Sequence, residues 1–71
     1  MSLNYQYNYA ELDPDTNMCI GIQSTTLALT ELPPYWVEIP VNDDEYIFKY
    51  YINGNWYEDA EGTIPWTSSL L

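Results

Sequence analysis

Asn53 and Gly54 are the residues that most constrain the fold of this chain. Asn-Gly is the pair best suited to a two-residue type I′ turn, because both central residues of that turn have positive φ. Runs of aromatic and β-branched residues lie on both sides of the pair, at 46–52 and 55–59. The stretch 46–59 is therefore predicted to form a tight β-hairpin.

The turn also fixes which residues of this hairpin face each other. The predicted cross-strand pairs are Ile52–Asn55, Tyr51–Trp56, Tyr50–Tyr57 and Lys49–Glu58. Because successive side chains of a strand point to opposite faces, one face carries Phe48, Tyr50, Ile52 and Tyr57, and the other carries Ile47, Lys49, Tyr51, Trp56 and Glu58. We expect the face with Phe48 to cover the core. The face with Tyr51 and Trp56 is then a binding surface or a subunit contact.

The length of 71 residues predicts one domain, spanning 1–71. A chain of this size buries only about 60% of its unfolded surface, so its stability is marginal and oligomerisation is a common remedy. No apolar run approaches the roughly 18 residues of a membrane span, and no signal peptide is recognisable. We therefore expect a protein that is made and used in a reducing cytoplasm, or released from one.

The charge balance limits the partners. Eleven acidic residues against one lysine give a net charge of −10. Direct binding to nucleic acid or to anionic lipid is not expected, because few cations could replace the counterions of either surface. A charged partner should be basic, although the acids could serve only for solubility. Three Trp, eight Tyr and one Phe exclude a disordered acidic tail.

A first hairpin is predicted near the N-terminus. Tyr5, Tyr7 and Tyr9 alternate with polar residues in a strand at 4–12, the stretch 13–17 has strong turn chemistry, and 18–23 is the returning strand. The predicted pairs are Leu12–Met18, Ala10–Ile20 and Tyr9–Gly21. Ala10, Leu12, Met18, Ile20 and Ile22 would share an apolar face. The tyrosines would share the other face, where Gly21 leaves room for the ring of Tyr9.

Shorter secondary-structure elements are predicted in the middle of the chain. Residues 24–32 suit a strand, which the threonines favour, or a short helix capped by a serine or threonine. After Pro33 and Pro34, a short strand at 35–39 ends before Pro40, and an acidic loop follows at 42–45. The fold class is thus mainly β, a small antiparallel sheet of two hairpins with about five strands.

The last segment, 60–71, is predicted to be an irregular tail. Trp66 stands alone there, with Leu70 and Leu71 nearby. It is either part of a clasp folded back onto the domain or an anchor that inserts into a partner.

No catalytic residue, metal site or cofactor is predicted, and a small-molecule ligand is not expected. The chain has no histidine, and its single cysteine, Cys19, has no imidazole partner for nucleophilic catalysis. Cys19 lies in an apolar strand and is predicted to be a packing residue. Asp13, Asp15 and Asn17 imitate the start of a calcium loop, but the positions that need Gly and Glu hold Met18 and Ser24, so a plain turn is favoured.

Aromatic side chains are the best candidates for a functional surface. Tyr and Trp dominate interface hot spots and also stack on sugars. Most of the rings are expected to pack in the core, but the core cannot account for all of them. We predict that Tyr51, Trp56 and Trp66 form an interaction surface for a protein partner or for another copy of the chain.

The order of these features resembles a family of phage proteins. The chain is similar to short proteins encoded beside the tail genes of phages and prophages of Gram-positive bacteria. The similar segments are 9–13 with 19–22 (Tyr-Ala-Glu-Leu-Asp, Cys-Ile-Gly-Ile), 37–40 (Val-Glu-Ile-Pro) and 49–58 (Lys-Tyr-Tyr-Ile-Asn-Gly-Asn-Trp-Tyr-Glu). The resemblance covers roughly 9–59 and implies a small accessory or virion-associated β module, located in the cytoplasm of the bacterial host or in the virion. It supplies no catalytic residues to carry over to this chain.

Three functional hypotheses follow. The leading one is a non-enzymatic phage or prophage accessory or tail protein that acts through protein–protein contacts. The first alternative is an acidic mimic of DNA that blocks a host nucleic-acid-binding protein. Its phosphate mimics would be Asp43, Asp44, Glu45, Glu58, Asp59 and Glu61. The second alternative is a carbohydrate-binding module that uses exposed Tyr and Trp side chains.

Overall fold

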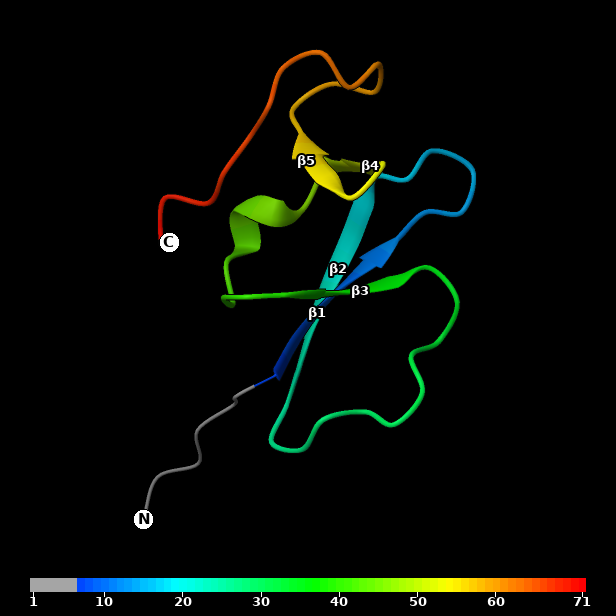
Figure 1. The fold of residues 1–71 in the computed structure, drawn as a ribbon, viewed down its shortest axis with the longest axis vertical. Helices are drawn as coiled ribbons and strands as arrows, with labels where there is room; N and C mark the ends of the chain where they lie inside the picture. The colour runs from blue at the N-terminus through cyan, green and yellow to red at the C-terminus, as the bar shows by residue number, and fades with distance from the viewer. Residues whose placement is uncertain (1–6) are drawn as a thin grey trace.

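The computed structural model describes residues 7–71, and its elements are almost all β-strands (Figure 1). In order they are β1 (Tyr7–Leu12), β2 (Cys19–Thr25), β3 (Trp36–Ile39), a 3-10 turn η1 (Asp44–Tyr46), β4 (Tyr50–Ile52) and β5 (Asn55–Tyr57). The strands form two antiparallel sheets, β2–β1–β3 and β4–β5. The predicted mainly β class with five strands is confirmed. No helix in this part of the chain is long and apolar enough to cross a membrane.

The first hairpin forms, but the predicted register is wrong. The backbone N–H of Asp13 donates to the carbonyl of Met18 at 2.8 Å, so the loop closes more tightly than predicted. Its closure is aided by Asn17, which has φ 63°. The pairs are Leu12–Cys19, Glu11–Gly21, Ala10–Ile22 and Tyr9–Gln23, with a β-bulge at Ile20.

The bulge changes the faces of β2. Cys19 takes the core position expected for Met18, and Ile20 points outward with 52% of its surface exposed. Gly21 lies opposite Glu11 and not opposite Tyr9, and a Cβ built on it would make an ordinary contact with that carboxylate. The predicted role of Gly21, to leave room for the ring of Tyr9, is therefore wrong. The predicted strand residues 4–6, including Tyr5, lie outside the described residues.

The core lies where the three-stranded sheet meets η1. Its buried members are Ala10, Leu12, Cys19, Ile39 and Tyr46. The predicted packing role of Cys19 is confirmed, because the residue is fully buried and its thiol donates a 3.4 Å hydrogen bond to the carbonyl of Gly21. Burial is the main cause that raises the pKa of this thiol, and a protonated thiol is a poor nucleophile.

The segment 24–32 is neither the predicted helix nor a complete strand. β2 ends at Thr25, and an exposed loop follows to Tyr35. The buried Tyr9 holds this loop, since its hydroxyl accepts a 3.2 Å hydrogen bond from the backbone N–H of Leu29. The strand predicted at 35–39 is confirmed as β3, which pairs with β1 on the side opposite β2.

The second hairpin has the predicted turn and register. Asn53 and Gly54 have φ of 52° and 85°, as the type I′ turn requires, and the three strand pairs run from Ile52–Asn55 to Tyr50–Tyr57. The ladder is shorter than predicted, because the Lys49–Glu58 pair does not form. The backbone N–H of Lys49 bonds to η1 and that of Glu58 bonds to Ile64.

The predicted assignment of the hairpin faces is wrong. Phe48, expected in the core, is 69% exposed, whereas Tyr51 and Trp56 pack against the core cluster. The predicted acidic loop contains η1, capped by Asp43. This turn and the tail cover the Tyr51 and Trp56 face, while the positive φ of Phe48 (76°) takes residues 46–49 out of the strand.

The C-terminal segment folds back along β5, as in the clasp alternative. The carbonyl of Trp56 accepts a 3.0 Å hydrogen bond from the N–H of Trp66, and Tyr57 forms an isolated bridge with Pro65. The segment then runs past η1 to the end of the chain (Figure 1). Apart from the bridge and its turns it is irregular, and its buried Ser68 is anchored by a hydrogen bond to Asp43.

Candidate functional site

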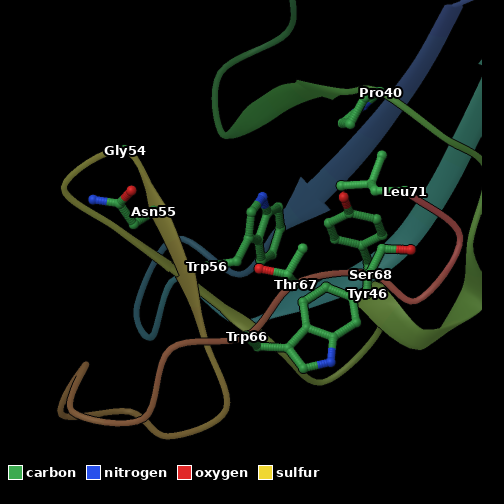
Figure 2. A pocket seen from close by; sticks show the side chains of 9 residues that line it. All are labelled: Pro40, Tyr46, Gly54, Asn55, Trp56, Trp66, Thr67, Ser68 and Leu71. Carbon is green, nitrogen blue, oxygen red and sulfur yellow. The ribbon is translucent and has the colours of Figure 1, made fainter.

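A pocket of about 240 Å³ lies between η1, the hairpin turn and the C-terminal segment. We call it the aromatic pocket (Figure 2). Its lining consists of Pro40, Tyr46, Gly54, Asn55, Trp56, Trp66, Thr67, Ser68 and Leu71. The structure thus brings together two of the three residues predicted as an interaction surface, Trp56 and Trp66. The third, Tyr51, packs against Trp56 with 5.0 Å between the ring centroids and the rings tilted at 54°, but it does not line the pocket.

Tyr46 is the ring that joins the two tryptophans. Its centroid lies 4.9 Å from that of Trp56 and 4.8 Å from that of Trp66, with interplanar angles of 71° and 82°. Edge-to-face packing is a preferred arrangement of aromatic pairs. Tyr46 is 2% exposed, whereas both tryptophans are half-buried. The buried tyrosine therefore fixes two partly accessible indoles.

Tyr46 is not among the residues that the sequence predicts for this site. Its place at the start of an aromatic run predicts the first position of a strand, although Tyr46 ends the 3-10 turn η1. A local signal was present in the acidic stretch before it. The carboxylate of Asp43 accepts a 2.9 Å hydrogen bond from the N–H of Glu45, which is the usual interaction of an N-cap aspartate.

A carboxylate lies directly behind the pocket wall. The hydroxyl of Ser68, a lining residue, donates a hydrogen bond to the carboxylate of Asp43. That bond is the main cause that lowers the pKa of Asp43, with smaller contributions from the N–H of Glu45 and the charge of Lys49. The pKa of Tyr46 is raised, first by burial and then by the negative charge of Asp43. Asp43 is thus an anion at neutral pH, one hydrogen bond away from a residue of the pocket wall.

The single lysine of the chain contacts the same cluster. The ammonium nitrogen of Lys49 lies 5.0 Å from the ring centroid of Trp66, within the range of a cation–π interaction. Lys49 does not line the pocket, and none of the described lining residues has a charged side chain.

A second candidate surface is formed by Ile20 and Phe48, which we call the outward pair. Cys19 links their backbones, since it accepts a 2.9 Å hydrogen bond from the N–H of Phe48 and donates a 2.8 Å hydrogen bond to the carbonyl of Lys49. The exposed fractions are 52% for Ile20 and 69% for Phe48. Ile20 lies in a β-bulge, and Phe48 has a left-handed backbone conformation. Both apolar side chains are therefore placed in solvent by a backbone irregularity.

The exposed loop between β2 and β3 adds further apolar surface. Its exposed large side chains are Leu27, Leu29, Leu32 and Tyr35. Leu27 is the most exposed of them, at 77%. A hydrogen bond from the N–H of Leu29 to Tyr9 attaches this loop to the sheet.

Two of the carboxylates that were predicted as phosphate mimics have internal partners. Asp43 bonds Ser68, and Asp59 accepts hydrogen bonds from Thr63 and from the N–H of Ile64 at 2.9 Å. The bond from the hydroxyl of Thr63 is the main cause that lowers the pKa of Asp59. The other four acids of that set, Asp44, Glu45, Glu58 and Glu61, are exposed.

The loop that imitates a calcium site is a turn stabilised by its own side chains. The carboxylate of Asp13 accepts a 2.8 Å hydrogen bond from the N–H of Asp15, and the hydroxyl of Thr16 accepts one from the N–H of Met18. Such local bonds are typical of Asp and Thr in turns. Within residues 7–71, no cluster of three or more His, Cys, Asp or Glu side chains is placed to hold a metal ion.

Comparison of the chain with protein-family models, with curated proteins and with solved structures finds no match.

Proposed function

We propose that this protein is a non-enzymatic module that acts through protein–protein contacts, as an accessory or tail protein of a phage or prophage. The observation that carries the proposal is Phe48, whose ring is 69% exposed on a backbone with φ 76°. A positive φ is an outlier for a bulky residue and costs of the order of 1–3 kcal/mol. Strain of this kind clusters at functional sites, where it fixes a side chain in the geometry that a partner needs.

The surroundings of Phe48 make it a pre-organised anchor. Its backbone is held by the hydrogen bond to Cys19, and Cys19 is fully buried in the core. Burial of a phenylalanine side chain yields about 1.5–3 kcal/mol relative to its exposed state. A partner that covers Phe48 and Ile20 would gain this free energy without ordering a flexible loop first.

The partner should be basic or carry a basic rim. The chain has a net charge of −10, and its only lysine contacts Trp66. Charge complementarity accelerates association and excludes partners of the same sign. The phage or prophage origin is supported by the sequence resemblance alone.

No specific observation favours either the DNA mimic or the carbohydrate-binding module. A DNA mimic needs carboxylates spaced on one open face, yet Asp43 and Asp59 are used in internal hydrogen bonds. A sugar platform needs aromatic rings exposed on a flat surface, yet Trp56 and Trp66 are half-buried in the wall of a small pocket.

The test compares Phe48→Ser with Tyr35→Ser. Both residues are aromatic, more than half exposed and at positive φ, but of the two only Phe48 is bonded to the buried Cys19. Tyr35 is therefore a control for the change in side chain and backbone without that attachment to the core. Sedimentation velocity of each chain measures self-association. Affinity capture from lysates of infected or induced host cells, followed by titration of the purified interactor, measures binding to a partner.

We expect Phe48→Ser to weaken the association by about tenfold or more, as loss of an aromatic anchor does. Tyr35→Ser should leave the association unchanged. The proposal fails if the wild-type chain is monomeric and captures no interactor, or if Phe48→Ser binds as tightly as wild type.

A further inference from the structure

We propose that the aromatic pocket binds a quaternary ammonium group, such as that of choline or of a trimethylated lysine. This inference goes beyond the proposed function and concerns a different surface from the outward pair. It revises the expectation that no small-molecule ligand binds this chain. The returning C-terminal segment supplies a wall that the sequence did not predict, because Trp66, Thr67, Ser68 and Leu71 all belong to it.

The rings supply the attraction. The face of an aromatic ring is electron-rich, and Trp binds cations better than Tyr or Phe. Two indoles and one phenol ring line this pocket, with Tyr46 less than 5 Å from each tryptophan between ring centroids. Figure 2 shows these three rings close together around the pocket. Aromatic residues gathered in this way are the usual means of recognising quaternary ammonium ligands.

The charges select a cation over an anion or a neutral ligand. The carboxylate of Asp43 lies one hydrogen bond behind Ser68, and the chain as a whole carries −10. No described lining residue has a charged side chain, so a bound cation would meet no ion pair with a side chain and no competing cation within the pocket. A quaternary ammonium group needs no hydrogen-bond acceptor, which suits this lining.

One of these rings already lies within cation–π distance of a cation in the structure. The ammonium group of Lys49, the only lysine, lies 5.0 Å from the ring centroid of Trp66. Because Lys49 does not line the pocket, it leaves the lining indole surfaces available.

The size and remaining contacts suit a small ligand. Drug-sized molecules bind in pockets of roughly 300–1,000 Å³, whereas this one has about 240 Å³. Pro40 and Leu71 offer apolar contacts for methyl groups. Asn55 and Thr67 offer polar atoms for the hydroxyl of choline or the amide of a lysine derivative.

The experiment uses the full chain with Trp36 replaced by phenylalanine. Trp36 stacks on Tyr9 in the three-stranded sheet and does not line the pocket. In this variant, tryptophan fluorescence reports only Trp56 and Trp66. The titrants are choline chloride, N-acetyl-trimethyl-lysine and 3,3-dimethylbutan-1-ol, which has the shape of choline without the charge. Sodium chloride keeps the ionic strength constant.

We expect saturable fluorescence changes with the two cations, and binding of the neutral alcohol between about threefold and thirtyfold weaker. Tighter binding of choline would assign the site to a free or headgroup ligand, and tighter binding of the lysine derivative would assign it to a methylated protein. Either result supports the site. Equal affinities for choline and the alcohol, or no saturation with either cation, would overturn it.

Two variants distinguish the contribution of the aromatic rings to ligand binding from that of the nearby charges. Trp66→Leu removes one indole and should abolish saturation, with circular dichroism as the check that the chain still folds. Lys49→Gln removes a like charge beside Trp66 and should tighten choline binding by about twofold to threefold. A folded Lys49→Gln chain that binds choline more weakly would contradict the electrostatic argument, even where Trp66→Leu fails to fold.

Discussion

The β2–β1–β3 sheet and the β4–β5 hairpin differ in what holds each of them in place. In the first, β1 pairs on both sides, through six residue pairs with β2 and four with β3. The second has three pairs in all. A two-stranded hairpin of this length is marginal in water. The hairpin with the better turn sequence is therefore the element that depends more on contacts from elsewhere.

Those contacts come from both sides of the hairpin in the sequence. Tyr46, before it, packs on Trp56, and the C-terminal segment, after it, bonds to Trp56 and Tyr57. The first hairpin adds a bridge from Met18 to Tyr50 and a 3.0 Å hydrogen bond from the N–H of Tyr51 to Asn17. A strong turn fixes register, and burial of aromatic rings supplies stability.

Tyr46→Ala is the substitution for which we expect the largest loss of stability. Truncation of a buried aromatic side chain costs about 3–5 kcal/mol, and a domain of this size has a total stability of roughly 4–10 kcal/mol. We expect the free energy of unfolding in urea to fall by this amount and the fluorescence of Trp56 and Trp66 to shift toward that of exposed indole. Tyr35→Ala, at an exposed site, should stay within about 0.5 kcal/mol of wild type. A small loss for Tyr46→Ala would show that the hairpin is stable without its aromatic partners.

Acidification tests the bond between η1 and the C-terminal segment. The pKa of Asp43 is lowered in the folded protein, chiefly by Ser68, so its contribution to stability is present above the unfolded pKa near 4 and is lost as pH falls through the folded value. We expect thermal stability to decrease between about pH 5 and pH 2. Asp43→Asn should be less stable at neutral pH and should show a shallower decrease. Asp44→Asn, which changes an exposed neighbour, is the control and should keep the wild-type slope. Equal slopes for both variants would rule out this role of Asp43.

Gly54→Ala tests how much the turn itself contributes. Gly54 has φ 85°, and a built Cβ meets no atom within 4 Å, so the cost is conformational rather than steric. We expect a loss of about 1 kcal/mol in urea unfolding. A much larger loss would mean that the turn, and not the aromatic packing, dominates the stability of β4–β5.

Gly21→Ala should have the smallest effect on the free energy of unfolding, and it should raise that free energy where the other substitutions lower it. An added Cβ would lie 3.6 Å from the side chain of Glu11, an ordinary contact, and Gly21 has no positive φ. Because alanine reduces the entropy of the unfolded chain, we expect a gain of about 0.5 kcal/mol. A loss of stability would indicate that the bulge before Gly21 needs the freedom of glycine.

The sequence predicted those features that depend on neighbouring residues. Asn53 and Gly54 determine the turn and the register of their hairpin, and proline limits the end of β3 at Pro40. The register of the first hairpin was wrong because the bulge at Ile20 accompanies backbone bonds between Cys19 and residues 48–49. Bonds between segments so far apart leave no local pattern.

The candidate site could be predicted only in part, for the same reason. Alternation showed that Tyr51 and Trp56 share a face, but which face is covered depends on where η1 and the tail lie. Trp66 was singled out as an isolated aromatic residue. Its approach to Tyr46 depends on the path of the C-terminal segment, which has no periodic pattern.

Pro65 has a further consequence for the behaviour of this chain in concentrated solution. It lies beside β5 through its bridge with Tyr57, at the side where a sheet could otherwise recruit a strand from another molecule. Proline has no N–H to donate, and natural proteins use it to protect exposed sheet edges from aggregation. Pro65 thus also protects this edge of β5 from pairing with a strand of another molecule, the first step of growth into fibrils.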